Sequence, residues 1–312
     1  MIQINVITDM YTKEEEQSLK EFLLQQITGF TEQLNLSSLK SIFIAKDYVE
    51  ELKSFQMEHS LEAIGATKSD TAIGVAKVVK YNEADGSLSQ TIFFKDQLLM
   101  GLFQEKLAAS TFHTIHHEFC HVHDNFVMQH IYSQVEDVQY RDLISLLRTH
   151  SDIIWREYVV ERLSIKSYRI DNVRSDVKYL FEMIEETNQG VMLSISEYKN
   201  SHNTGLLFKE LQEKANLLLK YSSAFCGAMQ GLQEISSECD YIGIISEQLG
   251  ESYYHDTWQR LNTELNELYA KYPKWESINV LDAVGKVVLK LWNDLGVEVH
   301  SQGNRIIIGV VD

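Results

Sequence analysis

The sequence predicts an α+β protein with a small mixed sheet and helices near its N-terminus, a helix carrying a histidine-rich motif, and a mainly helical region after it. Two observations favour this class. Roughly the first 95 residues mix the two-residue period of strands with helical spacing, whereas the pattern from there to about residue 293 is helical. A single proline, Pro273, leaves the later helices uninterrupted over long stretches.

The first two elements follow from local patterns. Ile2, Ile4 and Val6 alternate with polar residues, which predicts a strand. Thr12 and Glu15 then form a capping box, which predicts the start of a helix. The apolar residues of this helix recur at helical spacing and are Leu19, Phe22, Leu23, Ile27, Phe30 and Leu34.

The next elements are strands. Residues 41–45 predict a second strand. Residues 71–81 and residues 90–95 lie on either side of Asp85-Gly86, a dipeptide that favours a tight turn, and we expect them to form a hairpin. The N-terminal part is therefore predicted to be a small layer of strands and helices.

Helices dominate the remainder of the chain. Residues 97–106 predict a short helix and residues 110–130 a longer one that carries the motif. The tail, residues 296–312, predicts a terminal hairpin with its turn at Gln302-Gly303-Asn304; its Ile306-Ile307-Ile308 either pairs with the N-terminal sheet or closes the helical part. We expect an α+β domain over residues 1–130 and a helical region over residues 131–312.

Composition and charge limit the partners. The chain has 312 residues, and its 28 Lys and Arg against 45 Asp and Glu give a formal charge of −17. A nucleic-acid backbone would be repelled, so no nucleic acid is expected as a partner. The chain start lacks the features of a signal peptide, and no stretch approaches the roughly 18 apolar residues of a membrane helix. We expect a cytoplasmic protein without membrane contact. The sequence does not predict the oligomeric state.

The histidines are concentrated in the motif helix. Six of eleven lie between residues 113 and 130: His113, His116, His117, His121, His123 and His130. His117 and His121 are four residues apart, which on a helix places both imidazoles on one face, where they can bind one zinc ion. Glu118 follows the first of them in an HExxH pattern and is the expected general base. Cys120 lies off that face, and we expect it, with Cys226 and Cys239, to be a core residue rather than a ligand.

Thr114-Ile115-His116-His117-Glu118-Phe119-Cys120-His121-Val122 resembles the active-site helix of the zincin metallopeptidases. The resemblance implies Zn²⁺ as cofactor, a zincin-like fold around this helix and hydrolysis of peptide bonds. His123 departs from the family pattern, which has an apolar residue there. The metzincin branch is excluded because Asp124 and Val127 stand where its pattern requires Gly and a third ligand.

A second segment resembles the gluzincin branch. Within Trp155-Arg156-Glu157-Tyr158-Val159-Val160-Glu161-Arg162, the resemblance assigns Glu157 as third zinc ligand and Glu161 as a carboxylate that accepts a hydrogen bond from a ligand histidine. Arg156 departs from the Asn usual in thermolysin-like members. The reverse assignment, with Glu161 as ligand, stays open, as does the alternative that both are ion-pairing surface residues. Asp124, three residues after His121, is expected to orient an imidazole.

The layout also resembles short intracellular gluzincins of bacterial type, in which an edge strand beside the active-site helix holds the substrate. Gln90-Thr91-Ile92-Phe93-Phe94-Lys95 stands where that strand would be, and an interior strand is the equal alternative. The oxyanion-stabilising residue stays open among Tyr158, Tyr253, Tyr254 and His255.

The sequence thus predicts a zinc metallopeptidase, a hydrolase acting on a peptide or protein substrate. The alternatives are a regulatory or toxin-type protein-binding module on a metallopeptidase scaffold, and a zinc hydrolase that is not a peptidase.

Overall fold

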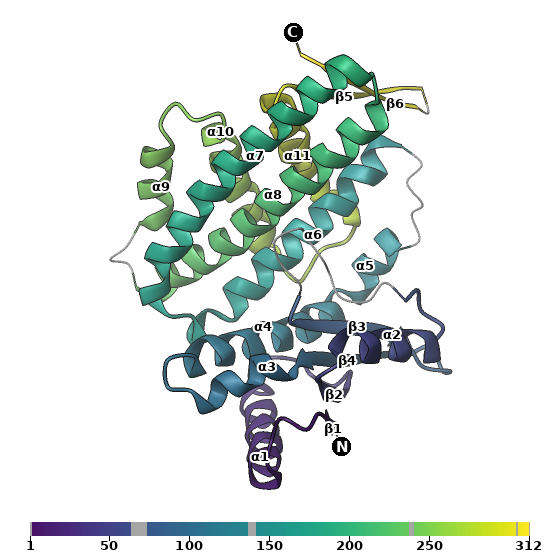
Figure 1. Ribbon diagram of the computed structural model, residues 1–312, viewed down its shortest axis with the longest axis vertical. Helices are drawn as coiled ribbons and strands as arrows, with labels where there is room; N and C mark the ends of the chain where they lie inside the picture. Colours follow the sequence, from purple (N-terminus) through teal and green to yellow (C-terminus); the bar gives the residue numbers. More distant parts are fainter. Residues whose placement is uncertain (1, 64–73, 137–141, 237–239, 304, 312) are drawn as a thin grey trace. The chain divides into compact units, whose positions relative to one another are not determined.

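The computed structural model describes residues 2–63, 74–136, 142–236, 240–303 and 305–311. The chain divides into two compact units (Figure 1). Unit 1 consists of Met1–Val127 with Lys166–Tyr168, and unit 2 of Met128–Ile165 with Arg169–Asp312. Unit 1 contains a four-stranded mixed sheet, and unit 2 is mostly helical with a two-stranded sheet. The predicted α+β class is confirmed.

Unit 1 alternates strands and helices. Its elements are β1 (Gln3–Ile7), α1 (Lys13–Phe30), β2 (Leu39–Ala45), α2 (Tyr48–Glu58), β3 (Ala76–Asn82), β4 (Leu88–Lys95), α3 (Asp96–Leu99), the 3₁₀ turn η1 (Met100–Phe103) and α4 (Ala108–Val127). The capping box predicted at Thr12 and Glu15 is present at the start of α1. The predicted first strand, second strand and hairpin correspond to β1, β2 and the pair β3 and β4.

The strand order in unit 1 is β1-β2-β4-β3. The strands β1, β2 and β4 are parallel, and β3 is antiparallel to β4. The strand over residues 90–95, considered above as a substrate-binding edge, is therefore an interior strand. The physical reason is that Ser89 to Phe94 are buried on both faces of the sheet, as expected of a central strand. The antiparallel edge is formed by β3.

The two faces of the sheet pack against different helices. Ile42, Ile92 and Phe94 are fully buried on the face covered by α4 and α1, where Phe30 and Phe119 have ring centroids 5.5 Å apart. The opposite face carries Phe93, which packs with Tyr48, Leu52 and Phe55 of α2. Alternate side chains of each strand thus fill two cores, and the core under α4 supports the motif.

The helix predicted over residues 97–106 is wrong in its extent. It ends at Phe103, and its second half is a 3₁₀ turn. Thr111 approaches this turn closely at Gly101, where a Cβ would lie 2.1 Å from the Thr111 hydroxyl oxygen. Glycine is also a poor helix former, so little opposes the tightening at this position. A turn then leads into α4, which begins at Ala108.

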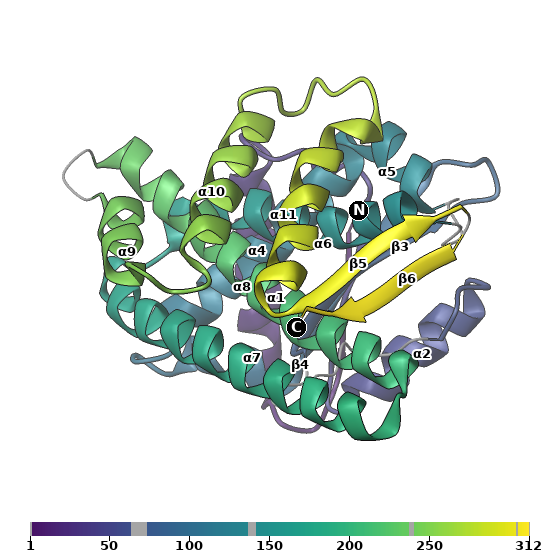
Figure 2. The same ribbon diagram turned by 90° about the horizontal axis from the view of Figure 1, so that it is seen from above.

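Unit 2 consists mostly of packed helices. Its elements are α5 (Gln129–Glu136), α6 (Leu143–Leu163), the turn η3 (Ile170–Asn172), α7 (Val173–Ser201), α8 (Thr204–Ile235), α9 (Tyr241–Leu249), α10 (His255–Tyr269), η4 (Ile278–Leu281), α11 (Asp282–Asp294), β5 (Val297–Gln302) and β6 (Arg305–Val310). The turn η2 (Ile165–Ser167) begins in unit 2 at Ile165 and continues in unit 1. The predicted terminal hairpin is present as β5 and β6, which lie beside α11 (Figure 2). The tail thus forms a two-stranded sheet of its own within the helical unit.

The helices α6 and α8 make the most intimate contact of unit 2. A Cβ at Gly227 would lie 2.2 Å from the Tyr158 carbonyl oxygen, and one at Gly231 would lie 3.0 Å from the Ile165 Cβ. Only glycine lets the two backbones approach this closely. The position of α6, which carries Glu157, is consequently fixed relative to α8.

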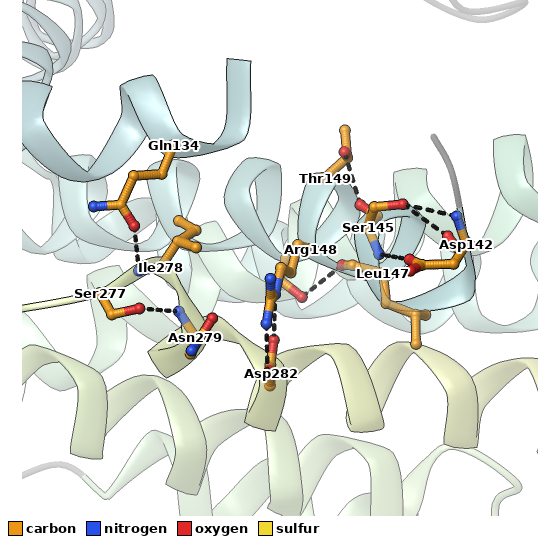
Figure 3. A network of polar contacts seen from close by, with 11 residues as sticks. Gln134, Asp142, Ser145, Leu147, Arg148, Thr149, Ser277, Ile278, Asn279 and Asp282 are labelled. Atoms are coloured by element: carbon orange, nitrogen blue, oxygen red, sulfur yellow. Dashed lines mark hydrogen bonds and ion pairs between the residues drawn. The ribbon is translucent and has the colours of Figure 1, made fainter. Parts of the chain in front are cut away.

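Polar contacts hold the first turns of α6 (Figure 3). Asp142 caps the helix and accepts a hydrogen bond of 2.8 Å from the Ser145 backbone. The Arg148 guanidinium donates two hydrogen bonds, of 2.7 and 3.0 Å, to the Asp282 carboxylate at the start of α11. This two-bond geometry is more directional than a single ion pair, so it fixes where α6 meets α11.

Two of the three cysteines lie in the core. Cys120 and Cys226 are fully buried, which confirms them as core residues. Residues 71–73 of the predicted hairpin, Cys239 and Asn304 lie outside the described residues. Among the helices that the structure describes, none combines the length and the apolar character needed to cross a membrane.

Acid should destabilise unit 2 through His150. This imidazole is 7% exposed, its Nε2 lies 3.2 Å from Gln212 Oε1, and burial lowers its pKa from 6.5 to about 4. In the unfolded chain the His150 imidazole is protonated below pH 6.5, whereas in the folded chain it is protonated only below about pH 4. The free energy of unfolding that is present above pH 6.5 therefore decreases as the pH falls from 6.5 to about 4. We expect a loss on the order of 3 kcal/mol, measured by urea unfolding. His150→Gln should flatten this dependence, whereas His300→Gln, at an exposed position, should not.

Candidate metal centre

The motif helix α4 is held by an apolar seam. Ile115, Phe119 and Val122 recur at helical spacing and are fully buried, and Phe119 packs against Phe30 of α1. Burying three large apolar side chains contributes several kcal/mol, roughly 1.5 to 3 kcal/mol each. The seam therefore determines which side of α4 turns away from the sheet.

A buried amide ties α4 to the sheet. Gln90 of β4 donates hydrogen bonds of 2.8 Å to the Val122 carbonyl oxygen and to the Ser38 hydroxyl, and its own oxygen accepts one of 2.9 Å from Asn125. Gln90 is fully buried. The sequence analysis did not predict this role. A glutamine next to the apolar residues of β4 could have indicated a buried polar contact. Sliding or rotation of α4 on β4 would break the two bonds that join Gln90 to Val122 and Asn125.

His117 and His121 converge. Their Nε2 atoms lie 3.1 Å apart, and their ring planes meet at 78°. Two nitrogens that each lie 2.0–2.1 Å from one tetrahedral zinc ion are about 3.3 Å apart. The observed separation agrees with this value within a few tenths of an ångström, so the spacing of the two nitrogens is compatible with a shared metal ion. The predicted pairing of these two imidazoles is present in unit 1.

Glu118 lies beside this pair on α4 and is 7% exposed. It is the next residue after His117, so it is rotated about 100° around the helix axis. Its negative charge is felt at Tyr48 of α2, where burial first and Glu118 second raise the pKa of the phenol above its usual range. Asp124, the residue predicted to orient an imidazole, is buried on α4 at 1% exposure.

The other histidines of this region have structural partners. His123 Nδ1 accepts a hydrogen bond of 2.7 Å from the Asn35 backbone, and burial lowers its pKa. His113 and His116 each place Nδ1 2.9 Å from the Ser167 hydroxyl. His116 also stacks on Phe30 at 4.2 Å between ring centroids, and His130 Nε2 contacts the Trp275 carbonyl oxygen at 3.2 Å. The abundance of histidine in this region thus reflects several structural contacts.

The predicted third ligand belongs to unit 2. Glu157 lies on α6 and its Oε1 is 2.9 Å from Lys220 Nζ of α8; the carboxylate side chain is 17% exposed. Glu161 is one turn further along α6. Burial first, and the nearby groups of Asp176, Tyr179 and Glu161 after it, raise the pKa of Tyr221 on α8. Arg156, which departs from the gluzincin pattern, pairs with Asp152 at 2.8 Å and lies over the Tyr132 ring.

Three of the candidate oxyanion stabilisers are engaged within unit 2. The Tyr158 hydroxyl donates to Gln230 and accepts from Arg162. Tyr253 donates to the Ile184 carbonyl oxygen at 2.8 Å, and Tyr254 donates to the Ser222 hydroxyl at 2.7 Å. Each hydroxyl would lose such a bond on turning to a substrate. His255, the fourth candidate, contacts Gln259 at 3.1 Å.

Comparisons of the chain with protein-family models, with curated proteins and with solved structures find no match.

Replacing Gln90 by Leu should destabilise unit 1 by about 3 kcal/mol, because three buried groups lose their hydrogen-bond partner while the volume is nearly conserved. Urea unfolding followed by circular dichroism measures the change. Gln33→Leu is the matched control, since the exposed Gln33 accepts one bond from Lys166 and should change stability by less than about 0.5 kcal/mol. Equal stability of the two variants would contradict the anchoring role of Gln90.

Proposed function

We propose that the protein is a zinc-dependent peptidase in which His117 and His121 bind the zinc and Glu157, assigned by the gluzincin resemblance, is the third ligand. The observation that carries the proposal is the convergence of the two Nε2 atoms at 3.1 Å. Two imidazole nitrogens and one carboxylate oxygen are a donor set that suits zinc, whereas calcium and magnesium prefer oxygen ligands alone.

When bound, zinc would polarise the scissile carbonyl and make a water more acidic. Glu118 then accepts the proton of the attacking water and delivers it to the leaving amine. Its place on α4 supports this role, because it is rotated away from the two ligand histidines and so lies beside the ligands rather than among them. Its low exposure restricts competing hydrogen bonds from bulk water.

The strand β3 supports a peptide as substrate. It is the antiparallel edge of the sheet, and α4 packs against it. In the part of the chain that the structure describes, no strand pairs with its outer side. An extended peptide can add to such an edge through main-chain hydrogen bonds. The formal charge of −17 adds a weak preference for basic or neutral peptides.

Glu118→Gln should abolish peptide hydrolysis and leave the zinc content unchanged, because the amide keeps the shape of the side chain but accepts no proton. Elemental analysis of the purified variant and digestion of a peptide library measure the two effects. We expect a loss of at least about 100-fold in kcat/KM. Loss of zinc in this variant, or undiminished hydrolysis, would contradict the role of Glu118.

The third ligand is tested by a pair of variants on α6. Glu157→Gln should remove most of the bound zinc, whereas Glu161→Gln should weaken zinc binding by about 10- to 100-fold at most, as expected of a group that only orients a ligand. Zinc titration with a chromophoric chelator measures both. The reverse order would assign the ligand to Glu161, and zinc binding that neither variant affects would remove both from the site.

Chelation separates the peptidase from the other classes. Removal of zinc should stop peptide hydrolysis, and added Zn²⁺ should restore it. A zinc-loaded protein that cleaves no peptide in the library but hydrolyses another class of ester or amide would be a different zinc hydrolase. A protein without zinc and without hydrolysis would favour a binding module.

A further inference from the structure

An ammonium group accompanies the proposed carboxylate ligand. Lys220 Nζ lies 2.9 Å from Oε1 of Glu157, within unit 2, and the two side chains are 40% and 17% exposed. A salt bridge in this position has a chemical consequence, because a carboxylate binds a metal ion through one oxygen or through both. An ammonium bonded to one oxygen competes with the second of these modes.

The packing of α6 against α8 fixes this pair. Along α8, Gln212 contacts His150 before Lys220, and Gly227 meets Tyr158 after it. These contacts involve residues before and after Glu157 on α6. Lys220 therefore reaches Glu157 from a helix whose position is set on both sides of the pair, so the geometry does not depend on the flexible lysine alone.

We propose that Lys220 is a positioning residue that holds Oε1 and restricts Glu157 to binding the metal through Oε2. This inference rests on the proposed zinc site. A catalytic zinc ion needs three protein donors and a free place for water or substrate. A carboxylate bound through both oxygens would add a fourth donor and crowd that place. Lys220 thus preserves the open position without touching the substrate.

The test replaces zinc by Co²⁺, whose visible absorption weakens severalfold as its coordination number increases. In Lys220→Met, both oxygens of Glu157 can bind the metal ion, which raises its coordination number. The cobalt protein should therefore absorb less strongly, and kcat should fall with little change in KM. Lys220→Arg keeps a cation at Oε1 and should restore the spectrum of the original protein. X-ray absorption of the zinc forms measures the same change in coordination independently.

The matched control is Lys214→Met. Lys214 lies on the same helix and pairs with Glu210 at 3.1 Å, with side chains 32% and 29% exposed. Its replacement should leave the cobalt spectrum unchanged. Circular dichroism verifies that each variant is folded, and Lys220→Gln provides a second neutral variant should Lys220→Met fail to fold.

Different results would overturn the proposed zinc site and the role of Lys220. Absence of Co²⁺ and Zn²⁺ binding in the original protein would overturn the proposed function, and this inference with it. Metal binding by the original protein, with an unchanged cobalt spectrum in Lys220→Met and Lys220→Gln, would overturn the role of Lys220 alone. Complete loss of metal from these folded variants would likewise overturn it, because Lys220 would then be required for binding rather than for the mode of binding.

Discussion

The burial of one face of α4 is the constraint on which the candidate centre depends. Each residue turns the helix by about 100°, so Phe119 and Val122 lie within about 40° of Ile115, whereas His117 and His121 lie about 200° and 240° from it. The seam is fully buried, and so the two imidazoles must face away from the sheet. Glu118 falls between the two directions, which accounts for its low exposure. The hydrogen bonds of Gln90 fix the same rotation from the strand side.

Local signals predicted the elements well, and long-range pairing was the part that the sequence could not predict. The capping box of α1 and the turn at Gly86, which adopts a φ of 82°, are encoded within a few residues. The position of β4 in the sheet depends instead on pairing with β2, which is distant in sequence. The polar residues Ser89, Gln90 and Thr91 are compatible with an edge strand by composition. In the folded chain their polar groups bond to the side chains of Glu83, Ser38 and Ser41, and the strand is interior.

In the candidate centre, too, local spacing was predictable from the sequence and long-range contacts were not. Two imidazoles on one helix are predictable because four-residue spacing determines their geometry, as the Nε2 separation of 3.1 Å shows. The histidines around them were not separable by spacing. His123 bonds to Asn35, and His113 and His116 contact Ser167, and each of these partners is distant in sequence. The partner of Glu157 is equally non-local, since Lys220 comes from a different helix.

The rigidity of α6 bears on how strongly a carboxylate on it can bind a metal. Arg148 and Asp282 hold its first half, and close contact with Gly227 and Gly231 holds its second half. Near the end of α6, Arg162 is only 8% exposed, and its guanidinium lies 3.8 Å from the centroid of the Tyr269 ring. It also donates hydrogen bonds to Gln230, Glu234 and Asn266. A ligand on such a helix loses little backbone freedom when it binds an ion. For the proposed zinc site, part of the entropic cost of binding would thereby be met during folding, and the remaining cost would be that of ordering the Glu157 side chain, which its contact with Lys220 already restricts.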